Sequence, residues 1–148
     1  PRAQIVTPNH FELDLLTGRE TNTVAEVLEA ADALRATGPD VVLVTSTVLA
    51  GGNPDEILML VDTADGAWQV TTPRLERSFT GSGDLTAALF LAHYLEGDDA
   101  GVAMGRTADV VYSLLLATTE AGSDELLLVR AQDQLVSPSH HFDVVRLR

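Results

Sequence analysis

The sequence predicts an α/β fold, because strand and helix patterns follow one another from the N-terminus. The run Val41–Val44 is uninterruptedly aliphatic, as is typical of a parallel strand that is covered on both faces. The stretch 24–36 instead carries its apolar residues at helical spacing. With 148 residues and 45% hydrophobic content, the chain has the size of one domain and can bury a core.

Four elements are expected in the N-terminal part of the chain. In chain order they are a strand over 3–6, a helix over 11–16, a helix over 24–36 and a strand over 41–44. The first helix is expected to end near Gly18, since glycine commonly follows a helix C-terminus. Thr21–Thr23 can cap the second helix, and Gly38-Pro39 stops it.

A β-hairpin is predicted next, because two β-rich runs, Ile57–Val61 and Ala67–Thr72, flank a loop that contains Asp65-Gly66. The remaining elements are helices over 84–95, 100–118 and 125–135 and a terminal strand over 142–147. So few strands would leave edges and faces of the sheet uncovered, which predicts a missing partner segment.

Residue usage excludes several classes of function. The formal net charge is −13 at pH 7, which argues against nucleic acid and membranes as partners. There is no cysteine, which excludes disulfides, zinc–thiolate sites and cysteine nucleophiles. A reducing, cytoplasmic location fits this usage. All basic residues are arginine, so a lysine P-loop and a Schiff-base lysine are excluded as well.

The stretch Phe79–Leu85, with the sequence Phe-Thr-Gly-Ser-Gly-Asp-Leu, carries the clearest chemical signal. Its two glycines permit a tight turn with converging N–H groups. The apolar helical run that follows begins with free N–H donors and the positive end of the helix dipole. The stretch therefore predicts an anion site, with phosphate as the expected anion.

Asp84 admits two interpretations at this site. A carboxylate repels an anion, unless its task is to take a proton from a nucleophile that attacks the anion. Alternatively, Asp84 is a helix N-cap, and Gly81 and Gly83 belong to a plain loop. From this stretch alone both interpretations stay open.

Thr45-Ser46-Thr47 are expected at the carboxyl end of the strand Val41–Val44. Ligands of open α/β sheets bind beyond the carboxyl ends of strands, so these hydroxyl groups are candidates for ligand contact. A solvated loop is the alternative.

Other polar residues have simpler interpretations. The four histidines lack the i,i+4 spacing of paired metal ligands, and His140-His141 lie beside Pro138 in an expected turn. Asp98 or Asp99 is expected to cap a helix, and Trp68 is expected to pack in the core or the hairpin.

The sequence resembles the pyridoxal kinases of the ribokinase-like superfamily along its whole length. The matching stretches are Ile5–Glu12, Leu15–Arg19, Gly38–Asp40, Val42–Ser46, Phe79–Leu85 and Glu125–Asp133. A Thr-Pro-Asn-x-x-Glu element followed by Gly-x-Gly-Asp is far more specific than either motif alone.

The resemblance implies a three-layer α/β sandwich with a mainly parallel sheet. Proteins of this family are about twice as long, so residues 1–148 would form the C-terminal half, which carries the ATP site and the catalytic base. Residue 1 is proline, so we expect a chain that was processed or cut at this point. The missing N-terminal half is then an expected partner, and the complete protein is expected to be a homodimer.

The resemblance also implies a reaction. Asp84 matches the family's base, which takes a proton from the 5′-hydroxymethyl group of pyridoxal, or a related B6 vitamer, as it attacks the γ-phosphate of ATP. Gly81, Ser82 and Gly83 match the anion hole, which stabilises the transferred phosphoryl group.

The remaining matches concern ATP and Mg²⁺. Thr45 and Ser46 match residues that touch ATP, and Phe79 would line the adenine side. Asn9 and Glu12 match an element that supports Mg²⁺ and the triphosphate. From the residues alone, Asn9 could be only an N-cap, and Glu12 only a first-turn acid favoured by the helix dipole.

Three hypotheses of function therefore stand. The first is a pyridoxal kinase, which the whole set of matches favours. The second is another ribokinase-like kinase, such as a hydroxymethylpyrimidine kinase. The third is a truncated, non-catalytic domain that binds a nucleotide or a partner.

Overall fold

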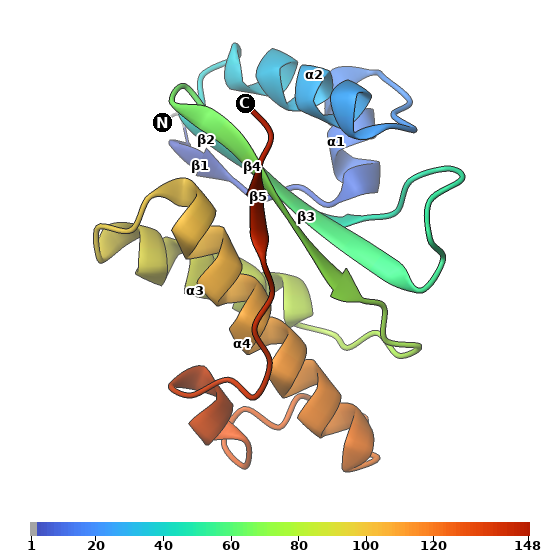
Figure 1. Ribbon diagram of the computed structural model, residues 1–148, viewed down its shortest axis with the longest axis vertical. Helices are drawn as coiled ribbons and strands as arrows, with labels where there is room; N and C mark the ends of the chain where they lie inside the picture. The colour runs from blue at the N-terminus through green and yellow to red at the C-terminus, as the bar shows by residue number, and fades with distance from the viewer. Residues whose placement is uncertain (1–2) are drawn as a thin grey trace.

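The computed structural model describes residues 3–148, in which a five-stranded sheet lies between two layers of helices (Figure 1). The elements are β1 (Ile5–Val6), α1 (His10–Thr17), α2 (Val24–Arg35), β2 (Val41–Thr47), β3 (Glu56–Thr63), β4 (Gly66–Pro73), α3 (Ser82–Leu95), α4 (Ala100–Glu120), the 3₁₀-helix η1 (Gln132–Leu135) and β5 (Val144–Arg146). Helices α1 and α2 cover one face, and α3 and α4 cover the other. The predicted α/β sandwich is confirmed.

The sheet is mixed within the described residues, with the strand order β1-β2-β3-β4-β5. Only β1 and β2 are parallel, and the other three pairings are antiparallel. The expectation of a mainly parallel sheet is therefore wrong for this stretch of chain. The reason is local, because β3 and β4 are joined by the predicted hairpin, and such a short connection forces an antiparallel pair.

Successive side chains of β2 point alternately into two hydrophobic cores, one on each face of the sheet. Val41 and Leu43 join the cluster beneath α3 and α4, whereas Val42 and Val44 join the cluster beneath α1 and α2. All four side chains are at most 2% exposed. This confirms that the aliphatic run is a strand covered on both faces, since successive side chains of a strand point to opposite faces.

Helix α4 approaches the sheet closely because two of its residues are glycines. A Cβ on Gly101 would lie 2.7 Å from ring atoms of Trp68 on β4, and one on Gly105 would lie 2.6 Å from Val144 Cγ2 on β5. These contacts fix how α4 crosses the outer strands. The expected packing of Trp68 in the hairpin and core region is confirmed.

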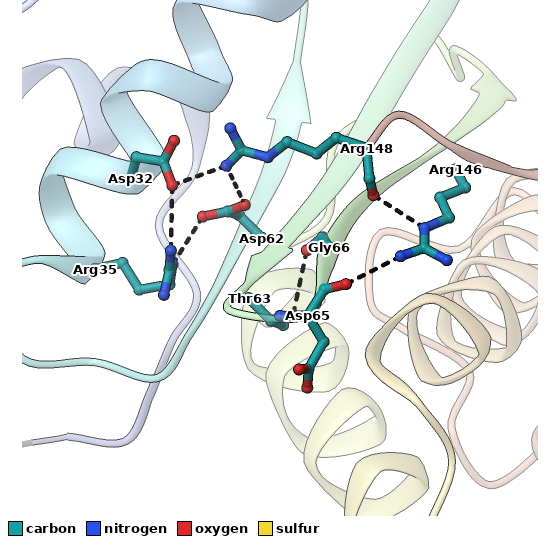
Figure 2. Close-up of polar contacts among 8 residues, drawn as sticks. All are labelled: Asp32, Arg35, Asp62, Thr63, Asp65, Gly66, Arg146 and Arg148. Atoms are coloured by element: carbon teal, nitrogen blue, oxygen red, sulfur yellow. Dashed lines mark hydrogen bonds and ion pairs between the residues drawn. The ribbon is translucent and has the colours of Figure 1, made fainter.

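A network of two carboxylates and two arginines ties α2, β3 and the last residue together (Figure 2). Asp62 on β3 is 1% exposed, and it accepts hydrogen bonds from Arg35 Nε at 3.0 Å and Arg148 Nη2 at 2.7 Å. The same arginines reach Asp32 on α2, at 3.2 and 2.8 Å. The buried carboxylate is thus paired on both oxygens, as burial of a charge requires.

The predicted helix over 125–135 is wrong. The structure has turns there and only the four-residue helix η1 at the end. Ser123 Oγ bonds the backbone of Glu125 in both directions, at 2.7 and 3.2 Å, which offers the backbone a local alternative to a helix. The terminal strand is also shorter than expected, and α3 begins two residues before Asp84.

Among residues 3–148, no helix is both long enough and apolar enough to cross a membrane.

Candidate nucleotide site

A cleft of about 660 Å³ lies between β2–β4, the loop that follows β4, and the first turns of α3. Five of the residues predicted for the site line it: Thr45, Ser46, Phe79, Ser82 and Gly83. They come from segments more than thirty residues apart in the chain, so the fold brings them together. Helix α4 forms another wall with residues that include Val111 and Tyr112.

Ser46 has a strained backbone at the edge of this cleft. Its φ is 53°, and it is the one non-glycine residue with positive φ in the part of the chain that the structure describes. The register of β2 against β3 shifts between Val44 and Thr47, so Thr45 and Ser46 lie in a bulge. Hence they lie within β2 and do not follow it as expected. Strain of this kind concentrates at functional sites.

The glycine turn forms the start of α3. Gly81, with φ of 87°, is the N-cap residue and provides no side-chain cap. The N–H of Ser82 donates to Phe79 O at 3.2 Å. The N–H groups of Gly83 and Asp84 have no protein acceptor among residues 3–148. The predicted free donors are therefore present at a helix N-terminus, beside the cleft.

Asp84 is the third residue of α3, not its N-cap, so that alternative is wrong. Its side chain is exposed, and no hydrogen bond or ion pair within residues 3–148 engages its carboxylate. Asp84 does not line the cleft, although Ser82 and Gly83 before it do. The carboxylate is therefore unpaired among the described residues, at the start of α3 and beside the cleft.

Asn9 and Glu12 cap the start of α1 with reciprocal hydrogen bonds, each from the backbone of one residue to the side chain of the other. Glu12 N donates to Asn9 Oδ1 at 2.8 Å, and Asn9 N donates to Glu12 Oε2 at 2.8 Å. Asn9 is thus an N-cap and Glu12 a first-turn acid, and together they form a capping box. An isolated parallel bridge joins Asn9 to Thr45, which places this helix start next to the cleft.

A second hollow, of about 490 Å³, is lined by Asn9, His10, Phe11, Asp14 and Ser46. Ser46 borders both hollows, so the start of α1 and the cleft adjoin one another. Glu12 lines neither hollow. Within 3–148, no three His, Asp or Glu side chains gather into a metal-binding cluster. Since Mg²⁺ commonly takes one or two carboxylates and keeps waters and phosphate oxygens, Glu12 with Asn9 still suits it.

Two cleft residues were missed in the sequence. Arg77 is ion-paired with Asp124 and lies over the ring of Phe79, with 5.4 Å from Cζ to the ring centroid. Arg74 lines the cleft beside it. The signal that could have found them was their position immediately before the glycine turn in a chain without lysine. The partner Asp124 could not be inferred, because it lies 47 residues away.

The segment around His140-His141, expected to be a turn, is irregular backbone with a bend at Ser139. His140 and His141 lie outside helices and strands, and His141 Nδ1 is 2.8 Å from Asp109 Oδ2 on α4. His140 N donates to Ser113 Oγ at 3.1 Å. Asp99 caps α4, as one of the two predicted candidates.

Comparison with known proteins decides the family. Residues 1–128 match the sequence model of the family described as phosphomethylpyrimidine kinase. The chain belongs to this family. The curated relatives of this phosphomethylpyrimidine kinase family member include proteins named pyridoxal kinase PdxY. The one from Leifsonia xyli is 44% identical over 147 residues, and the one from Rubrobacter xylanophilus is 45% identical over 148 residues.

Solved structures of pyridoxal kinases have the same fold. The enzyme from Leishmania donovani in complex with ADP and ginkgotoxin matches with a TM-score of 0.89 at 30% identity, covering 99% of this chain and 51% of that one. The pyridoxal kinase from Trypanosoma brucei matches with a TM-score of 0.84 at 30% identity, covering 98% of this chain and 52% of that one. The predicted ribokinase-like fold and the resemblance to pyridoxal kinases are thereby confirmed.

This family member spans about half the length of the curated relatives it matches. It covers 52% of the Leifsonia xyli protein and 51% of the Rubrobacter xylanophilus protein, while 99% of its own length is matched in both. The relatives therefore contain about as much chain again as is present here.

Proposed function

We propose that this chain supplies the nucleotide site, the anion hole and the catalytic base of an ATP-dependent kinase that phosphorylates the 5′-hydroxymethyl group of pyridoxal. One observation carries the proposal: Thr45, Ser46, Phe79, Ser82 and Gly83 line one cleft, with free N–H groups at the start of α3 beside it. The names of the curated relatives, and the ADP complex of the Leishmania donovani enzyme, support the choice of reaction.

In the proposed reaction, the hydroxymethyl oxygen attacks the γ-phosphorus of ATP. The bond from that phosphorus to the β–γ bridging oxygen breaks, and ADP leaves. The hydroxyl proton passes to the Asp84 carboxylate, which acts as general base. The products are pyridoxal 5′-phosphate and ADP, so atoms and charge balance.

The N–H groups of Gly83 and Asp84 hold the transferred phosphoryl group, where charge develops in the transition state. Ser82 supplies a hydroxyl at the same turn. Thr45 and Ser46 contact the phosphates or ribose of ATP, and Phe79 lines the adenine. When bound, Mg²⁺ would neutralise charge on the triphosphate, with Glu12 and Asn9 as its protein contacts.

The partners belong to the proposal too. The complete enzyme includes an N-terminal half that is not part of this chain, acts in the cytoplasm and is a homodimer. The Leishmania donovani pyridoxal kinase is known in complexes with ADP and pyridoxine and with ADP and pyridoxamine, which supports B6 vitamers as the substrate class.

A second candidate function is phosphorylation of a hydroxymethylpyrimidine. The description of the matching family, phosphomethylpyrimidine kinase, favours it. Both candidates share the cleft, the anion hole and the base, so they differ only in the substrate pocket. A non-catalytic, nucleotide-binding domain is the third possibility.

The deciding experiment follows phosphorylation of pyridoxal and of hydroxymethylpyrimidine by this chain, alone and together with the rest of a relative's sequence. We expect pyridoxal 5′-phosphate to form once the rest is supplied. Phosphorylation of only the pyrimidine would establish the second candidate. No transfer to either, with ADP still bound, would establish the third.

Asp84→Asn tests the base. We expect transfer to fall by roughly a hundredfold or more, because general base catalysis contributes about that much, while ADP binding is unchanged. Product formation and ADP titration measure the two effects. An undiminished rate in the active enzyme would remove Asp84 from the mechanism.

A further inference from the structure

Two arginines line the nucleotide cleft of a chain that has no lysine. Arg74 and Arg77 are the only basic residues along the cleft within residues 3–148, and Asp55 and Glu76 line it as well. The side chains of the cleft therefore carry no net charge, and the carboxylate of Asp84 lies beside them. A nucleotide would add several negative charges here, which favours a cation close to the free N–H groups of α3.

Arg77 is the arginine that contacts the start of the glycine turn. Its Cζ lies 5.4 Å from the centroid of the Phe79 ring, which is 5% exposed and thus firmly held. The carbonyl of Phe79 accepts a hydrogen bond from the N–H of Ser82, the first residue of α3, at 3.2 Å. The guanidinium of Arg77 therefore rests on the residue that joins the cleft to the anion site.

The ion pair that holds Arg77 is exposed. Arg77 Nη2 donates to Asp124 Oδ1 in the turn after α4, and the Asp124 side chain is 93% exposed. By contrast, the carboxylate of Asp62 that binds Arg35 and Arg148 is 1% exposed. A single exposed ion pair contributes little to stability, because water screens both charges. The guanidinium of Arg77 can therefore leave Asp124 at low cost.

We infer that Arg77 is a phosphate-binding residue of the nucleotide site, and that it exchanges the Asp124 carboxylate for a phosphate group when a nucleotide binds. The inference rests on the proposed function. A diphosphate carries more charge than one carboxylate, and the planar guanidinium can donate two parallel N–H groups to phosphate. In this exchange Asp124 competes with the nucleotide for Arg77.

The same pair has a simpler structural interpretation, as a tether between the loop before the glycine turn and the turn after α4. The two interpretations predict opposite effects of Asp124→Asn. Removal of a tether loosens one wall of the cleft and weakens ADP binding. Removal of a competing carboxylate releases Arg77 and strengthens ADP binding.

The test is a calorimetric titration of the chain and its variants with ADP and with adenosine. We expect Asp124→Asn to bind ADP about two- to fivefold more tightly, since an exposed ion pair no longer has to break. Arg77→Gln should bind ADP about tenfold more weakly, because a charged hydrogen bond to phosphate is lost. Neither change should alter adenosine binding, since adenosine has no phosphate.

The double variant Arg77→Gln/Asp124→Asn shows whether Asp124 acts through Arg77. We expect it to bind ADP as weakly as Arg77→Gln alone, because the carboxylate then has no guanidinium to hold. The matched control is Glu125→Gln, which removes the same charge from the next residue, an exposed position. It should leave ADP affinity unchanged, which separates the exchange from a general effect of net charge.

Three results would overturn the inference while the unchanged chain still binds ADP. They are weaker ADP binding by Asp124→Asn, undiminished ADP binding by Arg77→Gln, and an equal gain in affinity from Glu125→Gln. Each of them leaves the nucleotide site in place and removes only the role of Arg77. If the unchanged chain binds no ADP, the nucleotide site itself is wrong, and the inference falls with it.

Discussion

Ser46 is the residue at which backbone strain and the proposed nucleotide site coincide. A left-handed conformation at a serine costs about 1 kcal/mol relative to glycine. The residue before it, Thr45, takes part in the bridge to Asn9, so the bulge turns the chain beside both hollows. The strain is thus local to the segment that we assign to ATP.

Ser46→Gly separates strain from contact. It should raise the free energy of unfolding by about 1 kcal/mol, because glycine adopts φ of 53° without a Cβ penalty. It should also weaken ADP binding, since the hydroxyl is lost. Urea unfolding and ADP titration measure the two effects.

The matched control for this change is Ser46→Ala, which removes the hydroxyl and keeps the strain. It should weaken ADP binding without a gain in stability. If Ser46→Gly binds ADP as tightly as the unchanged chain, the contact assigned to this hydroxyl is wrong.

At the scale of elements, the contact between α4 and the sheet depends on glycine. A helix-interior glycine is normally less favourable than alanine, by about 1 kcal/mol. At Gly101 this order is reversed, because a Cβ would lie 2.7 Å from the rigid indole ring of Trp68. The helix or the ring has to move to admit it.

Gly101→Ala should therefore destabilise the protein, on the order of 1–2 kcal/mol, as overpacking of a core does. Thermal and urea unfolding give the change. The control is Gly83→Ala on α3, where a Cβ meets nothing within 4 Å and stability should not fall. Equal stability of the Gly101 variant and the unchanged chain would contradict the close approach of α4.

Elements defined by local signals were predictable from the sequence. The caps Asn9, Thr23 and Asp99 mark helix starts, and Gly18 marks a helix end, as expected. Elements that depend on distant partners were not. The apolar residues over 126–129 suggested a helix, but Val129 is 81% exposed and has no core to cover.

The same division applies to the candidate site. Resemblance to a known family predicted the residues that gather at the cleft, such as Thr45, Phe79 and Gly83. The bulge at Ser46 depends on the pairing of β2 with β3, which no local pattern encodes. The pair Arg77–Asp124 joins two loops that meet only in the folded chain.

At the scale of the whole molecule, the network around Asp62 links stability to pH through Asp32. Burial raises the pKa of Asp32, but hydrogen bonds from Arg148 and Arg35 outweigh burial, and its pKa lies below the usual value. A carboxyl group whose pKa is lowered by folding stabilises the folded state above its unfolded pKa. This contribution is lost as the pH falls through its folded pKa.

Asp32→Asn should lower stability at pH 7, and the difference from the unchanged chain should shrink as the pH falls below about 4. Urea unfolding at several pH values measures this. Glu20→Gln, which removes an equal charge from an exposed position before α2, controls for the net charge of −13. A difference that stays constant with pH would show that the ion pairs of Asp32 do not stabilise the fold.

The most direct test of the nucleotide site is a calorimetric titration of this chain with ADP and, separately, with adenosine. We predict saturable binding of ADP at one site and clearly weaker binding of adenosine. The reason is that only ADP offers phosphate to the free N–H groups of Gly83 and Asp84. Adenosine binding as tightly as ADP, or no binding of ADP, would contradict an anion site at the start of α3 and with it the proposed kinase role of this chain.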